Sequence, residues 1–235
     1  MSETPPRAVC LVSGGMDSAV ALAEARVRGF ACTALSFDYG QRHRRELLAA
    51  ERVARALGAV DHRVVVLDLR TVGGSSLTAD MAVPKDRTHD AIGRGVPPTY
   101  VPARNTVFLS VALGLAEVVG AHDLFLGVNA LDYSGYPDCR PEFLRAFEAL
   151  ARVATVAGAE RNEPLRIHAP LLEMTKRDIV LRGRELGVDF ALTHTCYDPV
   201  VVGGGTLACG RCDACILRLK GFAEAHVTDP VPYAS

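Results

Sequence analysis

The chain has 235 residues, of which 49% are hydrophobic and 23% are charged. That length suits one large domain, and the apolar content is sufficient for a core and excludes intrinsic disorder as the global state. Lys and Arg number 26 and Asp and Glu number 27, for a net charge of −1. Proteins that bind long nucleic acids usually carry a basic excess, so we expect no nucleic-acid partner.

The sequence predicts neither a membrane span nor a secretory signal. No apolar run approaches the roughly 20 residues that a spanning helix needs, and the polar residues 1–7 include two prolines. We therefore expect a cytoplasmic protein without a membrane partner.

Short apolar runs alternate with helical patterns along most of the chain. Strands are expected at residues 8–12, 31–37, 63–69, 123–128 and 166–169. Helices are expected at residues 19–28, 43–57, 107–119, 141–157 and 175–186. Strands and helices that alternate through short links are typical of a parallel sheet with helices on both faces. The predicted fold class is α/β, with a doubly wound parallel sheet.

Two stretches interrupt this alternation. Residues 70–102 have little periodicity, and a loop of that length in a compact domain is usually a lid or a disordered segment, so we expect it to be mobile. Residues 129–140 are rich in Asp, Tyr, Ser, Gly and Pro and directly follow a buried strand. Ligands bind at the carboxyl ends of parallel strands, so this second loop is well placed for chemistry. We expect an α/β domain over residues 1–190 and a small C-terminal region over 191–235.

The turn after the first predicted strand has the sequence SGGMDS, residues 13–18. Its two glycines let backbone N–H groups face an anion, and the start of the next helix adds a partial positive charge. Neither GxxxxGK[ST] nor GxGxxG occurs, which excludes P-loop NTPases and the common dinucleotide binders. An ordinary capped turn is the alternative. The SGGxDS pattern is narrower, and it resembles the pyrophosphate-binding loop of the PP-loop ATP pyrophosphatases, which adenylate a substrate oxygen.

Four of the seven cysteines lie close together near the C-terminus, namely Cys196, Cys209, Cys212 and Cys215. Four thiolates suit a tetrahedral zinc ion. A C-x2-C-x2-C run with a remote fourth cysteine can also hold a [4Fe–4S] cluster, so the spacing alone leaves the metal open. A redox CxxC pair would leave other cysteines of the cluster unexplained.

Six motifs occur in one order over most of the chain. They are SGGMDS, SFDYGQRH, VPARN, GVN, DYSGYPDCRPEF and CGRCDAC. Together they resemble the 7-cyano-7-deazaguanine synthase family of queuosine biosynthesis. Members of that family convert 7-carboxy-7-deazaguanine, ammonia and ATP to the nitrile, and they carry a structural zinc ion. Two features depart from the family pattern: Ala103 stands where glycine is usual, and the link between Cys196 and Cys209 is several residues longer.

The resemblance implies a set of site residues. ATP would be bound by Val12, Ser13, Gly14, Gly15, Met16, Asp17, Ser18, Ala19, Val20, Ala21 and Leu22. Catalysis would depend on Asp17, Ser18, Arg104 and Lys176. The deazaguanine would be bound by Tyr39, Gln41, Arg42, Asn129, Asp132, Tyr133, Tyr136 and Asp138. One structural zinc ion per chain would be held by Cys196, Cys209, Cys212 and Cys215 in a helical C-terminal region. The resemblance further implies ATP with Mg²⁺ and a homodimer.

Physical chemistry supports these assignments. Asp17 can position phosphates through Mg²⁺, with ordinary helix capping as the alternative. Arg104 can pair with a phosphate or with the substrate carboxylate, whereas Arg177 is expected at the surface. A deazaguanine needs a stacking ring and a carboxylate that accepts from its N1–H and amine, and core packing is the alternative for each tyrosine. His43 and His194 are candidates for proton transfer, although structural histidines are commoner.

Two other functions fit parts of the sequence. One is a different PP-loop adenylase that modifies tRNA, and the other is a zinc-dependent nucleic-acid-binding module. The near-neutral charge disfavours both, and the second leaves SGGMDS unexplained.

Overall fold

The computed structural model describes residues 4–43, 45–92, 94–129, 136–203 and 205–234. Its centre is a sheet of five parallel strands in the order β3-β2-β1-β4-β5. The strands are β1 (Arg7–Leu11), β2 (Ala31–Asp38), β3 (Asp61–Val66), β4 (Asp123–Phe125) and β5 (Arg166–His168). The chain moves outward from β1 to β3 and then returns to the other side of β1. The order therefore reverses between β1 and β4, where the carboxyl ends of the strands leave room for a ligand.

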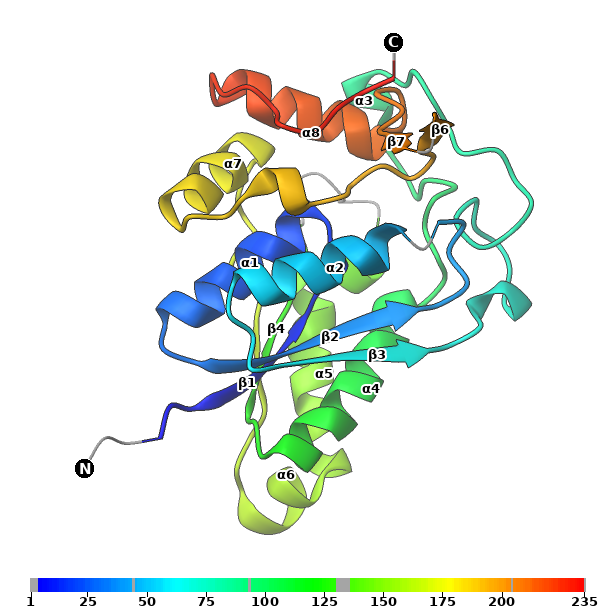
Figure 1. The fold of residues 1–235 in the computed structure, drawn as a ribbon. Helices are drawn as coiled ribbons and strands as arrows, with labels where there is room; N and C mark the ends of the chain where they lie inside the picture. Colours follow the sequence, from blue (N-terminus) through cyan, green and yellow to red (C-terminus); the bar gives the residue numbers. More distant parts are fainter. Residues whose placement is uncertain (1–3, 44, 93, 130–135, 204, 235) are drawn as a thin grey trace.

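Helices cover both faces of the sheet (Figure 1). On one side lie α1 (Met16–Val27) and α2 (Arg45–Ala56), with α7 (Lys176–Glu185) and α8 (Asp213–Glu224) outside them. On the other side lie α4 (Arg104–Val119), α5 (Pro141–Ala154) and α6 (Val156–Arg161). The remaining elements are η1 (Leu69–Thr71), α3 (His89–Ile92), η2 (Pro137–Cys139), η3 (Phe190–Leu192), β6 (Val200–Val202) and β7 (Gly205–Leu207). The predicted α/β fold with a doubly wound parallel sheet is confirmed.

Each face of the sheet has its own hydrophobic core. The core under α1 contains Met16, Leu22 and Phe125, and the opposite core contains Leu109 and Phe147. Helix α1 is alanine-rich and buried on most of its surface, because α2, α7 and the sheet pack around it. A helix buried in this way needs no polar stripe.

The strands predicted to end at 69 and 128 end three residues earlier, at Val66 and Phe125. Among the helices, three predictions differ from the structure by three residues or in the number of helices. Helix α1 begins at Met16 rather than 19, and α4 begins at Arg104 rather than 107. The single helix predicted over 141–157 is two helices, α5 and α6. Thr155 between them has extended backbone angles, and its hydroxyl accepts a hydrogen bond from the Gly158 N–H at 3.0 Å. A threonine that caps a new helix in this way ends the one before it.

Ala103, the residue before α4, has a left-handed backbone with φ 52° and ψ 23°. This conformation is unfavourable for a residue with a Cβ, by roughly 1–2 kcal/mol, and it is accessible to glycine. Ala103 thus adopts, with strain, a conformation that the glycine of the VPGRN pattern would adopt without it.

The long stretch 70–102 is packed against the molecule at several points. Ser75 and Ser76 are fully buried, and the Ser76 N–H donates to the Pro98 carbonyl at 2.8 Å. Lys85 forms an antiparallel bridge with Cys212. The stretch thus contacts the C-terminal cysteine region, and its mobility stays a prediction. Within the described part of the chain, no helix is both long enough and apolar enough to cross a membrane.

Candidate active site

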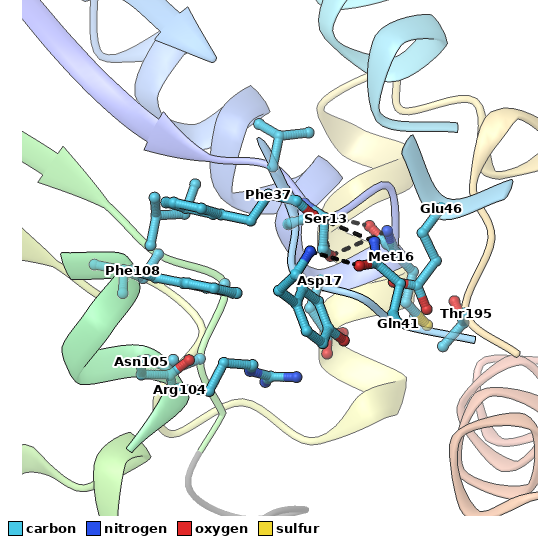
Figure 2. A pocket seen from close by; sticks show the side chains of 18 of the residues that line it. Ser13, Met16, Asp17, Phe37, Gln41, Glu46, Arg104, Asn105, Phe108 and Thr195 are labelled. Atoms are coloured by element: carbon cyan, nitrogen blue, oxygen red, sulfur yellow. Dashed lines mark hydrogen bonds between the residues drawn. The ribbon is translucent and has the colours of Figure 1, made fainter. Parts of the chain in front are cut away.

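A cavity of about 210 Å³ lies at the carboxyl ends of β1, β2 and β4. Its walls come from the turn before α1, the first turns of α2 and α4, and the segment after η3 (Figure 2). This is the place where the sheet order reverses, as expected for a ligand site in a doubly wound fold.

The SGGMDS turn forms one wall of this cavity, and its two serines hold its shape. The Ser13 and Ser18 hydroxyl oxygens are 3.1 Å apart, and the Ser18 hydroxyl donates to the Gly15 carbonyl at 3.0 Å. The first turn of α1 follows directly, so its backbone N–H groups and its partial positive charge are directed at the cavity. The arrangement suits a polyphosphate.

Two glycines allow the close packing around this turn. A Cβ on Gly14, whose φ is +84°, would lie 2.3 Å from the Glu46 carbonyl oxygen. A Cβ on Gly127, just after β4, would lie 2.7 Å from the backbone of Asp17 and Ser18. The turn is thus wedged between α2 and the end of β4, with no space for a larger residue.

Asp17 and Lys176 form an ion pair beside the turn. Lys176 Nζ lies 2.7 Å from Asp17 Oδ2, and only 4% of the Lys176 side chain is exposed. The Asp17 Oδ1 atom is also buried and has no hydrogen-bond partner among the described residues. Lys176 begins α7, whose start is held by reciprocal hydrogen bonds between Thr175 and Asp178. One carboxylate oxygen of Asp17 is therefore available for a cation or a ligand.

Not all of the predicted ATP-binding residues reach the cavity. The lining residues are Val12, Ser13, Gly15, Met16, Asp17 and Ser18. Ala19, Val20, Ala21 and Leu22 belong instead to the core under α1, because the helix leads away from the cavity after its first turn. Gly14 faces α2.

Aromatic side chains and Arg104 form a second wall. The rings of Phe37 and Phe108 are stacked, with centroids 4.0 Å apart and planes 3° from parallel. The Tyr39 ring is tilted against Phe108 at 5.5 Å. Arg104 Cζ lies 5.9 Å from the Tyr39 ring and 5.8 Å from the Phe108 ring. Burial raises the pKa of Tyr39 to about 12, with a contribution from Glu46, so the phenol stays a neutral hydrogen-bond donor. This wall offers a flat apolar surface beside one cation.

Four of the predicted substrate residues line the cavity: Tyr39, Gln41, Asn129 and Tyr136. The Gln41 side chain stabilises the turn in which it lies, since its Oε1 accepts a hydrogen bond from the Tyr39 N–H at 2.8 Å. The Tyr136 hydroxyl is 2.8 Å from that of Thr99. Asn129 donates to the Leu171 carbonyl at 3.0 Å.

The other predicted substrate residues do not line it or cannot be placed. Asp138 is buried, and its carboxylate accepts from the Asn105 N–H at 3.0 Å, because the unpaired amides at the start of α4 need an acceptor. Arg42 is exposed and donates to the Met81 carbonyl at 2.9 Å. Asp132 and Tyr133 lie outside the described residues.

Glu46, which the sequence analysis missed, also lines the cavity. Burial raises the pKa of its carboxyl to about 7, while the nearby charge of Arg104 acts in the opposite direction. In the sequence, an acidic residue in the first turn of a helix is explained by the helix dipole alone, so no signal distinguished Glu46. Phe37 and Phe108 were missed as well, because aromatic residues in predicted strands and helices are usually core.

The two histidines and Arg177 have different surroundings. His194 lines the cavity, and burial lowers its pKa. His43 Nε2 lies 3.9 Å from the Asp198 carboxylate, outside the cavity lining. The Arg177 side chain is 52% exposed, so its surface position is confirmed.

The four C-terminal cysteines converge in the fold. All four are buried, and their sulfur atoms lie within 4.8 Å of one another. A tetrahedral ion with Zn–S bonds of about 2.3 Å needs sulfurs roughly 3.8 Å apart, which small movements supply. Backbone N–H groups also face the sulfurs: Cys209 N lies 3.2 Å from Cys196 Sγ, and Cys212 N lies 3.3 Å from Cys209 Sγ. Such donors stabilise thiolates, so the cluster fits a metal ion.

The longer link between Cys196 and Cys209 forms the hairpin β6–β7. The four sulfurs still lie within 4.8 Å of one another with this longer link. Cys212 is the residue before α8, and Cys215 lies in its first turn.

A family model described as queuosine biosynthesis protein QueC matches residues 7–226. The chain belongs to this family. Two curated relatives support the same membership, and both are named 7-cyano-7-deazaguanine synthase. That of Geotalea daltonii is 62% identical over 228 residues, covering 97% of this chain and 96% of the relative. That of Geobacter metallireducens is 61% identical over 229 residues, covering 97% and 94%. The resemblance found in the six motifs is thus confirmed.

Among solved structures, a 4-thiouridine synthetase in complex with RNA and ATP is similar to this chain, and the matched region covers 78% of this chain and 41% of the synthetase chain. The identity is 20% and the TM-score is 0.49.

Proposed function

We propose that this protein converts 7-carboxy-7-deazaguanine, ammonia and ATP to 7-cyano-7-deazaguanine, in queuosine biosynthesis. The observation that carries the proposal is that one cavity joins two surfaces. The SGGMDS turn with Asp17 suits the phosphates of ATP, and the wall of Phe37, Phe108 and Arg104 suits a flat acid. Membership of the QueC family makes this pair of ligands the appropriate one.

The chemistry needs activation because a carboxylate is a poor electrophile. A carboxylate oxygen attacks the α-phosphorus of ATP, and the bond from that phosphorus to pyrophosphate breaks. Ammonia then adds to the acyl carbon, AMP leaves and one proton is lost, which gives the amide. A second ATP adenylates the amide oxygen. Loss of AMP and two further protons gives the nitrile.

The residues of this chain supply binding and charge. The N–H groups at the start of α1 and the SGGMDS turn would hold the phosphates. Asp17 would hold Mg²⁺ through Oδ1, and that ion would neutralise charge on the pyrophosphate when bound. Lys176 keeps Asp17 in place and adds positive charge beside the turn. Arg104 would bind the substrate carboxylate or the α-phosphate, where negative charge develops.

We propose zinc as the metal of the four cysteines, at one ion per chain. Four thiolates leave no open position for water or substrate, so its role would be structural. We also propose a cytoplasmic homodimer that acts on small molecules without a nucleic-acid partner, as the family resemblance and the net charge of −1 suggest. Light scattering after gel filtration would test the homodimer. A filter-binding assay with tRNA at stated salt would test the absence of a nucleic-acid partner.

One experiment tests the activity directly. The purified protein is incubated with ATP, ammonia and 7-carboxy-7-deazaguanine, and the products are measured by mass spectrometry. We expect the nitrile, with AMP and pyrophosphate. Supplied 7-amido-7-deazaguanine should also yield the nitrile with ATP and without ammonia. An inert amide, under conditions where the acid reacts, would contradict the two-activation mechanism.

A further inference from the structure

Glu46 occupies an unusual position at the meeting point of the two walls. It is the second residue of α2, and its backbone carbonyl lies against Gly14 of the phosphate-binding turn. Its side chain lines the same cavity as Asp17 and Arg104. Figure 2 shows Glu46 and Arg104 entering that space from α2 and α4. The Glu46 side chain therefore lines the cavity between the phosphate-binding turn and the wall that contains Arg104.

The Glu46 carboxylate is not used by the fold. It has no hydrogen-bond or ion-pair partner among the described residues, whereas Glu51, five residues later in α2, pairs with Arg55 at 2.8 Å. The charged and titratable groups that share its cavity come from several elements: Asp17 from α1, Arg104 from α4, Tyr39 after β2, Tyr136 and Cys139 at η2, and His194 and Tyr197 after η3. Arg42 and His43 line a smaller adjoining pocket with Glu46.

Burial and the charge of Arg104 together explain why Glu46 can still ionise near neutral pH. Burial raises the pKa of Glu46 to about 7, and Arg104 limits that rise. A proton acceptor with a pKa near the working pH is well suited to general base catalysis. His194 is a weaker base, since burial lowers its pKa, and Lys176 is engaged with Asp17.

We infer that Glu46 is the general base that removes protons from the nitrogen during amide and nitrile formation. The inference rests on the proposed function. When ammonia adds to the acyl carbon, its nitrogen carries a positive charge. One proton passes from that nitrogen to the Glu46 carboxylate as the carbon–oxygen bond to AMP breaks. In the second stage the adenylated amide loses two protons from nitrogen, the second as the carbon–nitrogen triple bond forms and AMP leaves. Glu46 accepts each proton in turn and passes it to solvent.

Adenylation of the acid, the step before proton removal, separates a general base from a substrate-binding residue or a metal ligand. Adenylation of the acid needs no base at nitrogen, so Glu46→Gln should retain exchange of labelled pyrophosphate into ATP that depends on 7-carboxy-7-deazaguanine. It should also retain trapping of the acyl adenylate by hydroxylamine, a stronger nucleophile than ammonia. With ammonia, amide formation should fall by about 10²–10⁴-fold. Glu51→Gln, on the exposed side of the same helix, is the matched control and should behave as the wild type.

The pH dependence supplies a second measurement. With the amide as substrate, ionisation of free ammonia has no effect. The base must be deprotonated, so wild-type kcat/KM should fall as the pH falls through about 7, the pKa of Glu46. That inflection should be absent in Glu46→Gln and retained in Glu46→Asp. The Asp variant also provides the test if the Gln variant does not fold.

Three outcomes would overturn the inference. Loss of pyrophosphate exchange with a raised KM for the acid would make Glu46 a substrate-binding residue. Loss of exchange that excess Mg²⁺ restores would make it a metal ligand. Unchanged amide formation by a folded Glu46→Gln variant would mean that Glu46 has no role in catalysis. Failure of the wild type to make nitrile in the same assay would instead count against the proposed function.

Discussion

Lys176 Nζ lies 2.7 Å from Asp17 Oδ2, although 159 residues separate them in the chain. The pair depends on the packing of α7 against α1 and α8. A Cβ on Gly183 of α7 would lie 2.9 Å from Val20 of α1, and one on Gly221 of α8 would lie 2.6 Å from Lys176 itself. Glycines at these crossings let the helices come close enough for the cation to reach the phosphate-binding turn.

Asp17→Asn should remove adenylation while keeping the fold. The change removes a charge with almost no change in volume, so the proposed Mg²⁺ position loses its anionic ligand. We expect a drop of at least about 10²-fold in pyrophosphate exchange. Both the acid stage and the amide stage should fail, because the part of the chain that the structure describes contains one SGGMDS turn to serve them both. Asp61→Asn, at the exposed start of β3, is the control. Exchange at the wild-type rate would contradict the phosphate-site assignment.

Lys176→Met should reduce both activity and stability. It leaves the Asp17 carboxylate largely buried without its cation, at a cost of about 3 kcal/mol. Chemical denaturation would show the loss, and Arg177→Met, at an exposed neighbour, should show almost none. The double variant with Asp17→Asn should regain part of the stability, since it removes the unpaired charge. Strict additivity of the two single changes would mean that the pair is not coupled.

Ala103→Gly should stabilise the protein. Ala103 has a left-handed backbone, and glycine would relieve a strain of about 1 kcal/mol. Ala103→Val should do the opposite, because a β-branched side chain fits this conformation less well. The free energy of unfolding from urea titrations measures both changes. A glycine variant less stable than the wild type would mean that flexibility gained by the unfolded chain outweighs the strain.

Metal analysis should find one zinc ion per chain, and chelation should lower the melting temperature before it lowers the intrinsic activity. The reason is that four thiolates form a closed structural site. Cys215→Ser should lose the ion, whereas Cys10→Ala, buried in the sheet far along the sequence, should retain it. Iron with a brown colour would instead indicate a cluster.

Local sequence patterns were sufficient for much of the molecule. The alternation of apolar runs and helical segments predicted the parallel sheet, and SGGMDS predicted a turn at the carboxyl end of β1. The spacing of the cysteines predicted their convergence. Each of these depends on residues near one another in the chain, where backbone preferences and side-chain periodicity act directly. Helix boundaries such as that at Thr155 were less predictable, because competing caps decide them.

The tertiary structure alone decided which polar groups reach the cavity. Asp138 and Glu46 are both acidic residues in or near the motifs. The carboxylate of Asp138 accepts a hydrogen bond from the backbone at the start of α4, whereas the Glu46 side chain lines the cavity. Ala19 to Leu22 continue the phosphate-binding motif, yet the direction of α1 takes them into the core. The sequence by itself determined the sheet, the turn and the cysteine set. Where helices cross and which hydrogen bonds a carboxylate finds there depend on contacts between distant segments, and no local pattern encodes those contacts.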